Sequence, residues 1–273
     1  MSEPAVMDDA ALPRKPLLLY SPLLKEVGVP HAFSTRIGGV SRGVFSSLNF
    51  GNPGDIAPSA RDCKANIVAN QQLVLAEIDA VGREVVEVHQ VHGADILTLS
   101  RGTPAHRCTE TTKADALVAA DAARMLSVRV ADCVPVLLAS RDGHFVGAVH
   151  AGWRGVIAGV AARAVEAMRQ MGAANIFAAI GPCITAPSFE IGPEVVAAFR
   201  IAFGPQTPHV AQRPDGKGNA DMKNALREQL SRAGVGNIDI LPHCTVGDAT
   251  LFFSHRRDRG VTGRMMAIIG PRA

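Results

Sequence analysis

The sequence predicts a mixed α and β fold in one compact unit. Three short apolar runs, residues 126–130, 134–139 and 145–149, have the length of buried strands, and the tight Arg-Asp-Gly turn between the last two is typical of a hairpin. An Ala-rich segment, residues 155–171, has apolar side chains at helical spacing and is followed by a glycine. With 273 residues, of which 47% are hydrophobic and 19% charged, the chain is long and apolar enough to bury a sizeable core.

The chain before these strands is predicted to contain a tail, a turn-rich stretch, a helix and a strand. Residues 1–16 are polar and contain proline, which predicts a flexible N-terminal tail ahead of a single domain at 17–273. The glycine and serine content of residues 31–52 indicates tight turns with exposed backbone amides. Apolar periodicity predicts a helix over 59–78, and alternation predicts a strand over 84–91.

The chain after the Ala-rich segment is predicted to continue with further strands and helices. An apolar run at 176–180 indicates a strand, whereas residues 204–218, rich in proline and glycine, indicate an exposed loop. The remaining expected elements are helices at 193–203 and 221–233 and strands at 238–241 and 265–269.

Composition and charge argue against nucleic acids and membranes as partners. The net charge is only +3, and one Tyr and one Trp leave little aromatic surface for stacking bases. No apolar run approaches membrane-spanning length, and the N-terminus lacks the basic and apolar segments of a signal peptide. The five cysteines form no CxxC pair and fit reduced thiols in the cytoplasm: Cys63, Cys108, Cys133, Cys183 and Cys244.

Three apolar runs end at a His or a Cys and pass directly into a turn, at His92, Cys133 and His150. Strand ends that meet at one rim of a sheet bring such side chains together, and two imidazoles with one thiolate form a zinc ligand set with an open fourth position. We favour His92 because Gly93 follows it at the strand end, and His89 is the alternative ligand. The alternative to any metal is an inert buried cysteine beside structural histidines.

The neighbours of these positions indicate charge recognition. Asp132 ends an apolar run, where a carboxylate is costly to bury without a cation or a metal. His150 is followed by Gly152, Trp153 and Arg154 at a predicted helix start. Backbone amides and a guanidinium at such a place favour an anion, for example phosphate.

Short motifs are spread over the chain from residue 33 almost to the C-terminus. In chain order they are FSTR (33–36), GGVS (38–41), SLN (47–49), QVHG (90–93), ADALV (114–118), ADCVPVL (131–137), AVHAGWRG (148–155), IGPCI (180–184), FEIG (189–192), CT (244–245), FFSHRRD (252–258) and TGR (262–264). Together they resemble the YfiH or laccase-domain family, once labelled polyphenol oxidases and now regarded as purine nucleoside phosphorylases of broad specificity. The resemblance leaves only the N-terminal tail outside.

This resemblance implies a fold, a cofactor and a reaction. The implied fold is α+β, a layered α/β/β/α arrangement of mixed sheets flanked by helices in a single domain. The implied ligands of a Zn²⁺ ion are His92, Cys133 and His150. The implied substrates are purine nucleosides and inorganic phosphate: adenosine, inosine, guanosine and 5′-methylthioadenosine give free base and ribose 1-phosphate, and adenosine is also deaminated.

Phosphorolysis requires groups that hold phosphate near C1′ of the nucleoside. Our candidates for binding phosphate or ribose are Arg36, Asn49, Arg154 and Arg256. Each is weighed against the ordinary role of an arginine or amide on a solvated surface. Asp132 is a candidate catalytic residue, either as a base or as a group that orients a ligand. His255 stands where the family commonly has a Tyr, which implies a shifted nucleoside preference if that position packs near substrate.

Three other functions fit parts of the sequence. A multicopper oxidase fits poorly, because the nine histidines include no HxH pair. A cysteine hydrolase would use Cys133 as nucleophile and His150 as base, which conflicts with a metal-bound Cys133. A non-catalytic protein that binds or edits cell-wall precursors would need the His and Cys positions for folding alone.

Overall fold

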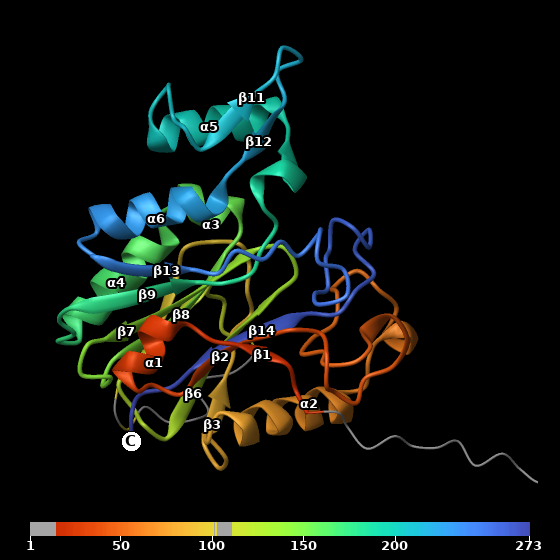
Figure 1. Ribbon diagram of the computed structural model, residues 1–273, viewed down its shortest axis with the longest axis vertical. Helices are drawn as coiled ribbons and strands as arrows, with labels where there is room; N and C mark the ends of the chain where they lie inside the picture. Colours follow the sequence, from red (N-terminus) through yellow and green to blue (C-terminus); the bar gives the residue numbers. More distant parts are fainter. Residues whose placement is uncertain (1–14, 101, 103–110) are drawn as a thin grey trace, which may run out of the picture.

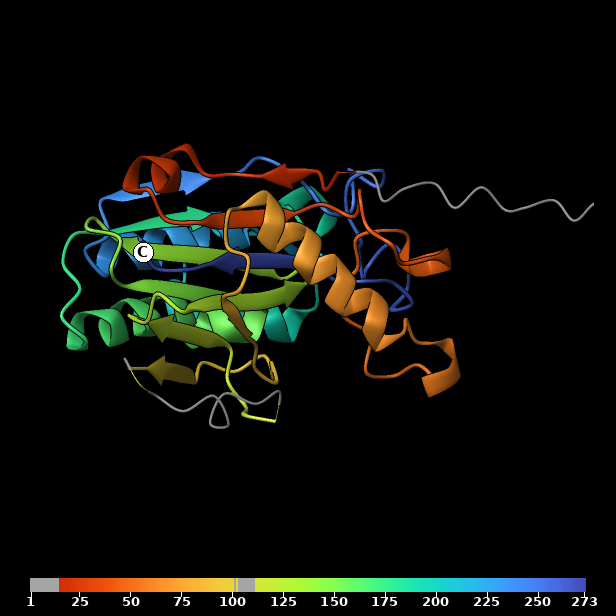
Figure 2. The same ribbon diagram turned by 90° about the horizontal axis from the view of Figure 1, so that it is seen from below.

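The computed structural model of the chain describes residues 15–100, 102 and 111–273. Within these ranges the chain forms three β-sheets and six α-helices, stacked as helix, sheet, sheet and helices (Figures 1 and 2). The predicted α+β class and its layered arrangement are therefore confirmed. Residues 1–14 of the predicted tail, and Cys108, lie outside the described residues, while Lys15 pairs with Glu77 at 2.8 Å.

One outer helix covers a five-stranded sheet. The strands lie in the order β1 (Leu18–Leu19), β2 (His31–Ser34), β14 (Met265–Ile269), β6 (Arg124–Val130) and β3 (Glu84–Val86). All neighbours are antiparallel except β3 and β6. Helix α2 (Lys64–Glu77) contributes Val74 and Leu75 to a core that contains Phe50, Met125 and Ile268.

A six-stranded sheet packs against the first sheet on one face and against helices on the other. Its order is β13 (Asn237–Ile240), β9 (Ile176–Ile180), β7 (Val134–Ser140), β8 (Val146–Ala151), β5 (Ala116–Ala119) and β4 (Ile96–Leu99). Because side chains alternate along a strand, Val136 and Leu138 of β7 face the helices, whereas Leu137 belongs to the core between the sheets. This explains why β7 is apolar throughout.

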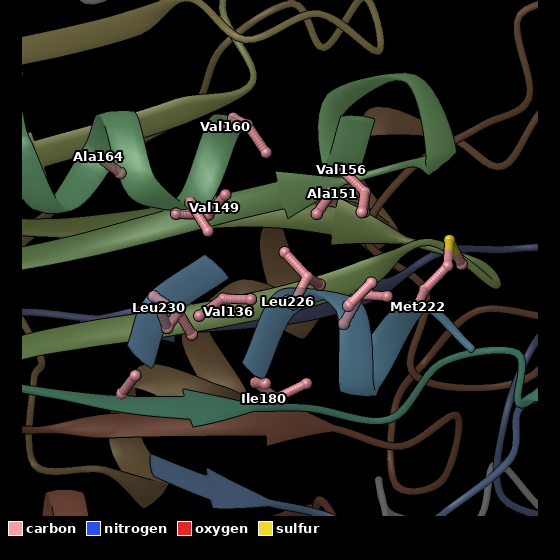
Figure 3. Packing of buried hydrophobic residues seen from close by; sticks show 14 of the residues in the cluster. Val136, Val149, Ala151, Val156, Val160, Ala164, Ile180, Met222, Leu226 and Leu230 are labelled. Atoms are coloured by element: carbon pink, nitrogen blue, oxygen red, sulfur yellow. The ribbon is translucent and has the colours of Figure 1, made fainter. Parts of the chain in front are cut away.

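The helical layer consists of α3 (Trp153–Ile157), α4 (Val160–Gln170) and α6 (Met222–Arg232). Figure 3 shows Val160 of α4 and Leu226 of α6 packed with Val136 and Val149 of the sheet. A small third sheet lies beyond α6 beside α5 (Pro193–Phe203), in the order β10 (Glu190–Ile191), β12 (Gly218–Ala220) and β11 (Val210–Gln212) (Figure 1). The short helix α1 (Pro22–Val27) packs on β9 and β13.

Most predicted elements are present, and the exceptions have local causes. The predicted strand over 84–91 ends at Val86, because the Gln90 side chain takes over the pairing: its amide exchanges two 2.8 Å hydrogen bonds with the backbone of Arg129. The predicted helix over 155–171 is divided into α3 and α4 at Gly159, which has φ 76°. The predicted loop over 204–218 contains β11 and the first residue of β12, and the predicted turns over 31–52 begin with the strand β2. The strands β1, β4, β5 and β10 and the helix α1 were not predicted.

None of the helices in the described ranges has the length and apolar content needed to cross a membrane.

Candidate active site

His92, Cys133 and His150 come together at one edge of the sheet pair. Their candidate ligand atoms all lie within 4.8 Å of one another, and the two imidazole rings meet edge to face with centroids 4.9 Å apart. Among the described residues this is the single group of at least three His, Cys, Asp or Glu side chains that converges in this way. His89, the alternative ligand, is outside the group, although it lines the same cavity.

The chain places these three side chains where it passes between the two large sheets. His92 lies between β3 of the five-stranded sheet and β4 of the six-stranded sheet, and Cys133 lies between β6 and β7 in the same way. His150 is the penultimate residue of β8, directly opposite Pro135 of β7. The group therefore joins the edges of both sheets.

The backbone at this edge adopts conformations that L-residues disfavour. His92 has φ 62° and Asp132 has φ 85°, both in the left-handed region. Such residues persist only where the surrounding structure holds them, and they cluster at functional sites. Gly152 is required by a close approach: a Cβ there would lie 2.8 Å from Cδ2 of His92 and 3.3 Å from Sγ of Cys133.

Asp115, which was not among the predicted site residues, fixes His92 and His150 through hydrogen bonds. It is fully buried directly before β5, and its carboxylate accepts hydrogen bonds from the backbone amides of His92 at 2.9 Å and Gly93 at 2.6 Å. His150 donates from Nδ1 to the same carboxylate at 2.8 Å, which leaves Nε2 as its candidate ligand atom. Against the effect of burial, these donors hold the pKa of Asp115 below its ordinary value.

The electrostatics of the group favour an ionised cysteine. Burial opposes ionisation of Cys133, but the neighbouring His150 and His92 overcome it and lower the pKa of the thiol to about 6. Burial likewise opposes protonation of His150, but the Cys133 thiolate and Asp115 raise the pKa of this imidazole. A thiolate is the form of cysteine that binds metals or attacks electrophiles.

The donor set fits a zinc ion. In a tetrahedral site with ligands at about 2.0–2.3 Å, neighbouring donor atoms lie about 3.5 Å apart, so small side-chain rotations within the 4.8 Å cluster suffice. A histidine ligand usually donates its other ring N–H to a carboxylate, as His150 does to Asp115. Three protein ligands leave one coordination position for a reactant.

The group lies in the wall of a cavity of about 570 Å³. Four of the sequence candidates line this cavity together with the group: Asp132, Arg154, Arg256 and His255. Lining residues that the sequence analysis did not select as candidates include Asn52, Asp55, Gln90, Arg129, Ile184, Phe189, Met222 and Arg264.

Arg36 and Asn49 do not line the cavity. Arg36 stacks on the Phe253 ring, with Cζ 4.5 Å from the centroid, and donates to backbone carbonyls of Ser46 and Ala249. Asn49 is fully buried, and its side-chain oxygen accepts from the backbone amide of Arg264 at 2.8 Å. Both residues hold loops in place behind the cavity wall.

Asp132 lines the cavity and is hydrogen-bonded to two residues that lie between β13 and β14 in the chain. Its two carboxylate oxygens each accept a 2.6 Å hydrogen bond, one from the Thr245 hydroxyl and one from the backbone amide of Arg256. Both contacts bridge more than a hundred residues of sequence, which satisfies the buried carboxylate without a metal. Neither hydrogen bond is to His92, Cys133 or His150, so the role of Asp132 as a base or as an orienting group stays a prediction.

Arg154, Arg256 and His255 are exposed at the cavity mouth. The Arg154 guanidinium lies over the Trp153 ring at 4.4 Å, and Arg256 donates to the backbone carbonyl of Glu190 at 3.3 Å. Phe189 lies beneath Arg256, with its ring centroid 5.4 Å from Cζ. These side chains flank the aromatic and apolar part of the cavity.

Comparison with known proteins places the chain in a family. A family model described as multi-copper polyphenol oxidoreductase laccase matches residues 30–272. The chain belongs to this family. A family member from Deinococcus radiodurans, named purine nucleoside phosphorylase, is 35% identical over 254 residues, covering 91% of this chain and 92% of the relative. The Escherichia coli K12 member, named purine nucleoside phosphorylase YfiH, is 36% identical over 242 residues, covering 89% and 93%.

Solved structures of the family share the fold. YlmD from Geobacillus stearothermophilus superimposes with a TM-score of 0.82 at 34% identity, covering 95% of this chain and 97% of YlmD. The Bacillus licheniformis hypothetical protein YfiH gives a TM-score of 0.80 at 30% identity, covering 96% and 98%. The match extends over nearly the whole of each family member.

Proposed function

We propose that this protein is a cytoplasmic, zinc-dependent purine nucleoside phosphorylase of broad specificity that also deaminates adenosine, with residues 17–273 as its single catalytic domain. The observation that carries the proposal is the convergence of His92, Cys133 and His150 in the wall of a cavity. Two family members about 35% identical to this chain are named purine nucleoside phosphorylases. The proposed nucleosides are adenosine, inosine, guanosine and 5′-methylthioadenosine.

The cavity suits a purine nucleoside in size and chemistry. Its volume of about 570 Å³ is typical of small-molecule sites. Ile184, Phe189 and Met222 give one part of the wall an apolar surface on which a purine ring packs. The lining also includes Gln90, Arg129 and the His/Cys group, whose polar atoms suit ribose and phosphate.

Each residue of the group would supply one ligand atom to a metal ion. Cys133 contributes a thiolate, and His92 and His150 contribute neutral ring nitrogens. Asp115 fixes the ring orientation and tautomer of His150. A Zn²⁺ ion bound here would supply Lewis acidity and lower the pKa of water.

Both reactions balance without a redox partner. In deamination, a water oxygen bonds to purine C6 and the C6–N bond breaks. The amino group leaves as ammonia with one proton of the water, and N1 of the purine takes the other. In phosphorolysis, an oxygen of HPO₄²⁻ bonds to C1′, the C1′–N9 bond breaks, and its electron pair stays on the purine, which takes the phosphate proton. The protein contributes orientation and stabilisation of the developing charge on the purine and ribose.

The test is product analysis on protein of known metal content. Adenosine is incubated with and without phosphate, and adenine, inosine and ribose 1-phosphate are separated by chromatography. We expect adenine and ribose 1-phosphate only with phosphate, inosine in both cases, and loss of zinc and of all products in Cys133→Ala and His150→Ala. Cys63→Ala, an exposed thiol before α2, is the matched control and should behave as wild type. Full zinc and turnover in either site variant would refute the assignment.

One observation favours a second candidate, a cysteine hydrolase. Cys133, His150 and Asp115 also form the series of nucleophile, base and orienting carboxylate. Protein that is fully active with no bound metal and loses activity on thiol alkylation would favour this reading. Loss of the folded state in Cys133→Ala, measured by circular dichroism, would instead favour a non-catalytic role in which the group only stabilises the fold.

A further inference from the structure

Two arginines lie side by side in the cavity wall. Arg129 is in β6, and Arg264 directly precedes β14, the antiparallel neighbour of β6. Met265 pairs with Val130, so Arg264 falls opposite Ala131, which shares a face of the sheet with Arg129. The two side chains are therefore diagonal neighbours on one face, and both line the cavity.

Gly51 allows both arginine side chains to pack closely against the same loop. A Cβ at Gly51 would lie 3.2 Å from Cδ of Arg129 and 3.4 Å from Cγ of Arg264. The loop that contains Gly51 also contributes Asn52 and Asp55 to the cavity wall. The backbone of this loop thus runs against both arginine stems.

The pair makes one long ion pair among the described residues, between Nη1 of Arg129 and Oε2 of Glu87 at 3.8 Å. The negative charges of Cys133, Asp132 and Asp55 act on Arg264 from farther away. Within the described part of the chain, Arg264 has no carboxylate oxygen within 4 Å, and its Nη1 donates to the backbone carbonyls of Thr262 and Gly263. Burial lowers the pKa of Arg264, yet a guanidinium stays charged at neutral pH.

Both arginines are held in position by side-chain amides. Asn49 accepts from the backbone amides of Gly51 at 3.2 Å and of Arg264 at 2.8 Å. Gln90 pairs with both backbone groups of Arg129. Asn49 is itself fixed by donating to Asp62 at 2.9 Å. Donors that are fixed before the ligand arrives lose little reorganisation energy on binding.

We propose that Arg129 and Arg264 form the oxyanion subsite that holds inorganic phosphate for attack on the nucleoside. This inference rests on the proposed function and assigns a binding site to inorganic phosphate, the second substrate. Two planar guanidiniums on one face match the oxygens of a tetrahedral dianion, and a partly desolvated position strengthens each contact. Arg154 and Arg256, in contrast, are exposed at the cavity mouth and already stack on aromatic rings.

Asn49 does not bind phosphate or ribose directly in this arrangement. Asn49 is a positioning residue, because its side-chain oxygen contacts the backbone amides of Gly51 and Arg264 and does not reach the cavity. The subsite also lies next to the His/Cys group, since Cys133 and both arginines line the same cavity.

The experiment measures phosphate use and phosphate binding in Arg129→Gln and Arg264→Lys. The second change keeps a charge in the more buried position but removes the planar fork, so the fold tolerates it. We expect the KM for phosphate, and the dissociation constant of phosphate measured by calorimetry, to rise about 10- to 100-fold, the usual effect of losing hydrogen bonds to a charged group. The KM for inosine should change far less. Zinc content and thermal unfolding establish that each variant is intact.

Arg163→Gln is the matched control, because Arg163 is exposed on α4 and remote from the cavity lining. It should leave phosphate binding at the wild-type value. An unchanged phosphate KM and dissociation constant in both cavity variants of an active enzyme would overturn the subsite. Loss of adenosine 5′-monophosphate binding with unchanged phosphate binding would also overturn it, because the pair would then recognise a 5′-phosphate.

Failure of the phosphorylase assignment can be distinguished from failure of the phosphate subsite. Wild-type protein that releases no base in the presence of phosphate would contradict the phosphorylase assignment. The calorimetric titration with inorganic phosphate then still tests the subsite. Weakened binding in Arg129→Gln would support it, and wild-type binding in both cavity variants would overturn it.

Discussion

Asp115 shows how a single buried carboxylate can define a site. Its Oδ1 accepts from the Nδ1 of His150 and from the backbone amide of His92, so the positions of two candidate ligands depend on the same oxygen. Its Oδ2 accepts from the backbone amides of Val91 and Gly93. A carboxylate with these partners acts on the metal through its ligands and never touches substrate.

We predict that Asp115→Asn weakens metal binding by about 10- to 100-fold, the usual cost of removing such a partner. The asparagine amide nitrogen cannot accept a hydrogen bond, so at least one N–H donor in the buried cluster loses its acceptor. Competition with a chromogenic zinc chelator measures the affinity. Asp142→Asn, in the β7–β8 turn at the far end of the strands from Cys133, is the control and should retain wild-type affinity. Equal affinities for Asp115→Asn and wild type would refute this role.

At the scale of elements, the turn from α1 into β2 depends on a neutral histidine. Nε2 of His31 accepts from the backbone amide of Ser21 at 3.1 Å, and Nδ1 donates to the backbone carbonyl of Val29 at 2.9 Å. Only the neutral imidazole can accept and donate in this way. Burial lowers the pKa of His31 from its usual 6.5.

This contribution should be lost in acid. Because the folded-state pKa of His31 is below that of the unfolded chain, the unfolded state binds a proton first as the pH falls, and stability decreases below about pH 6.5. The stability difference between wild type and His31→Leu, which cannot titrate, should therefore shrink between pH 7.5 and pH 5.5. Urea denaturation at both pH values measures it. A difference that stays constant or grows in acid would contradict the prediction.

At the scale of the whole molecule, the candidate metal site lies where the two large sheets meet. His92 and Cys133 lie on the two connections from the five-stranded to the six-stranded sheet, and His150 is in the six-stranded sheet. The apolar core between the sheets includes Phe33, Val128 and Leu137. A metal bound at this edge would add a further link between the two layers beside their packed core.

Metal removal should therefore lower thermal stability. A ligand present at 100 times its dissociation constant stabilises a folded protein by about 2.7 kcal/mol, which shifts Tm by on the order of 5–10 °C in a chain of this size. Calorimetry of zinc-loaded, chelator-treated and reconstituted protein measures the shift. Cys133→Ala should unfold at the same temperature with and without zinc. A Tm that is independent of zinc in the wild type would show that the ion is not bound at this junction.

The sequence by itself determined the class of fold, most of the central strands and helices, and the three positions that converge, although His92 lies six residues beyond the end of β3. These features follow from local periodicity and turn chemistry, which neighbouring residues specify. The tertiary structure alone decided which polar residues reach the cavity. Asp115 and Asp132 find their partners across 35 and more than a hundred residues, Asn49 is buried behind the wall, and Arg129 meets Arg264 only through strand pairing. A polar side chain has no local signature of its partner, because a hydrogen bond or a charge contact depends on distance in space and not on separation along the chain.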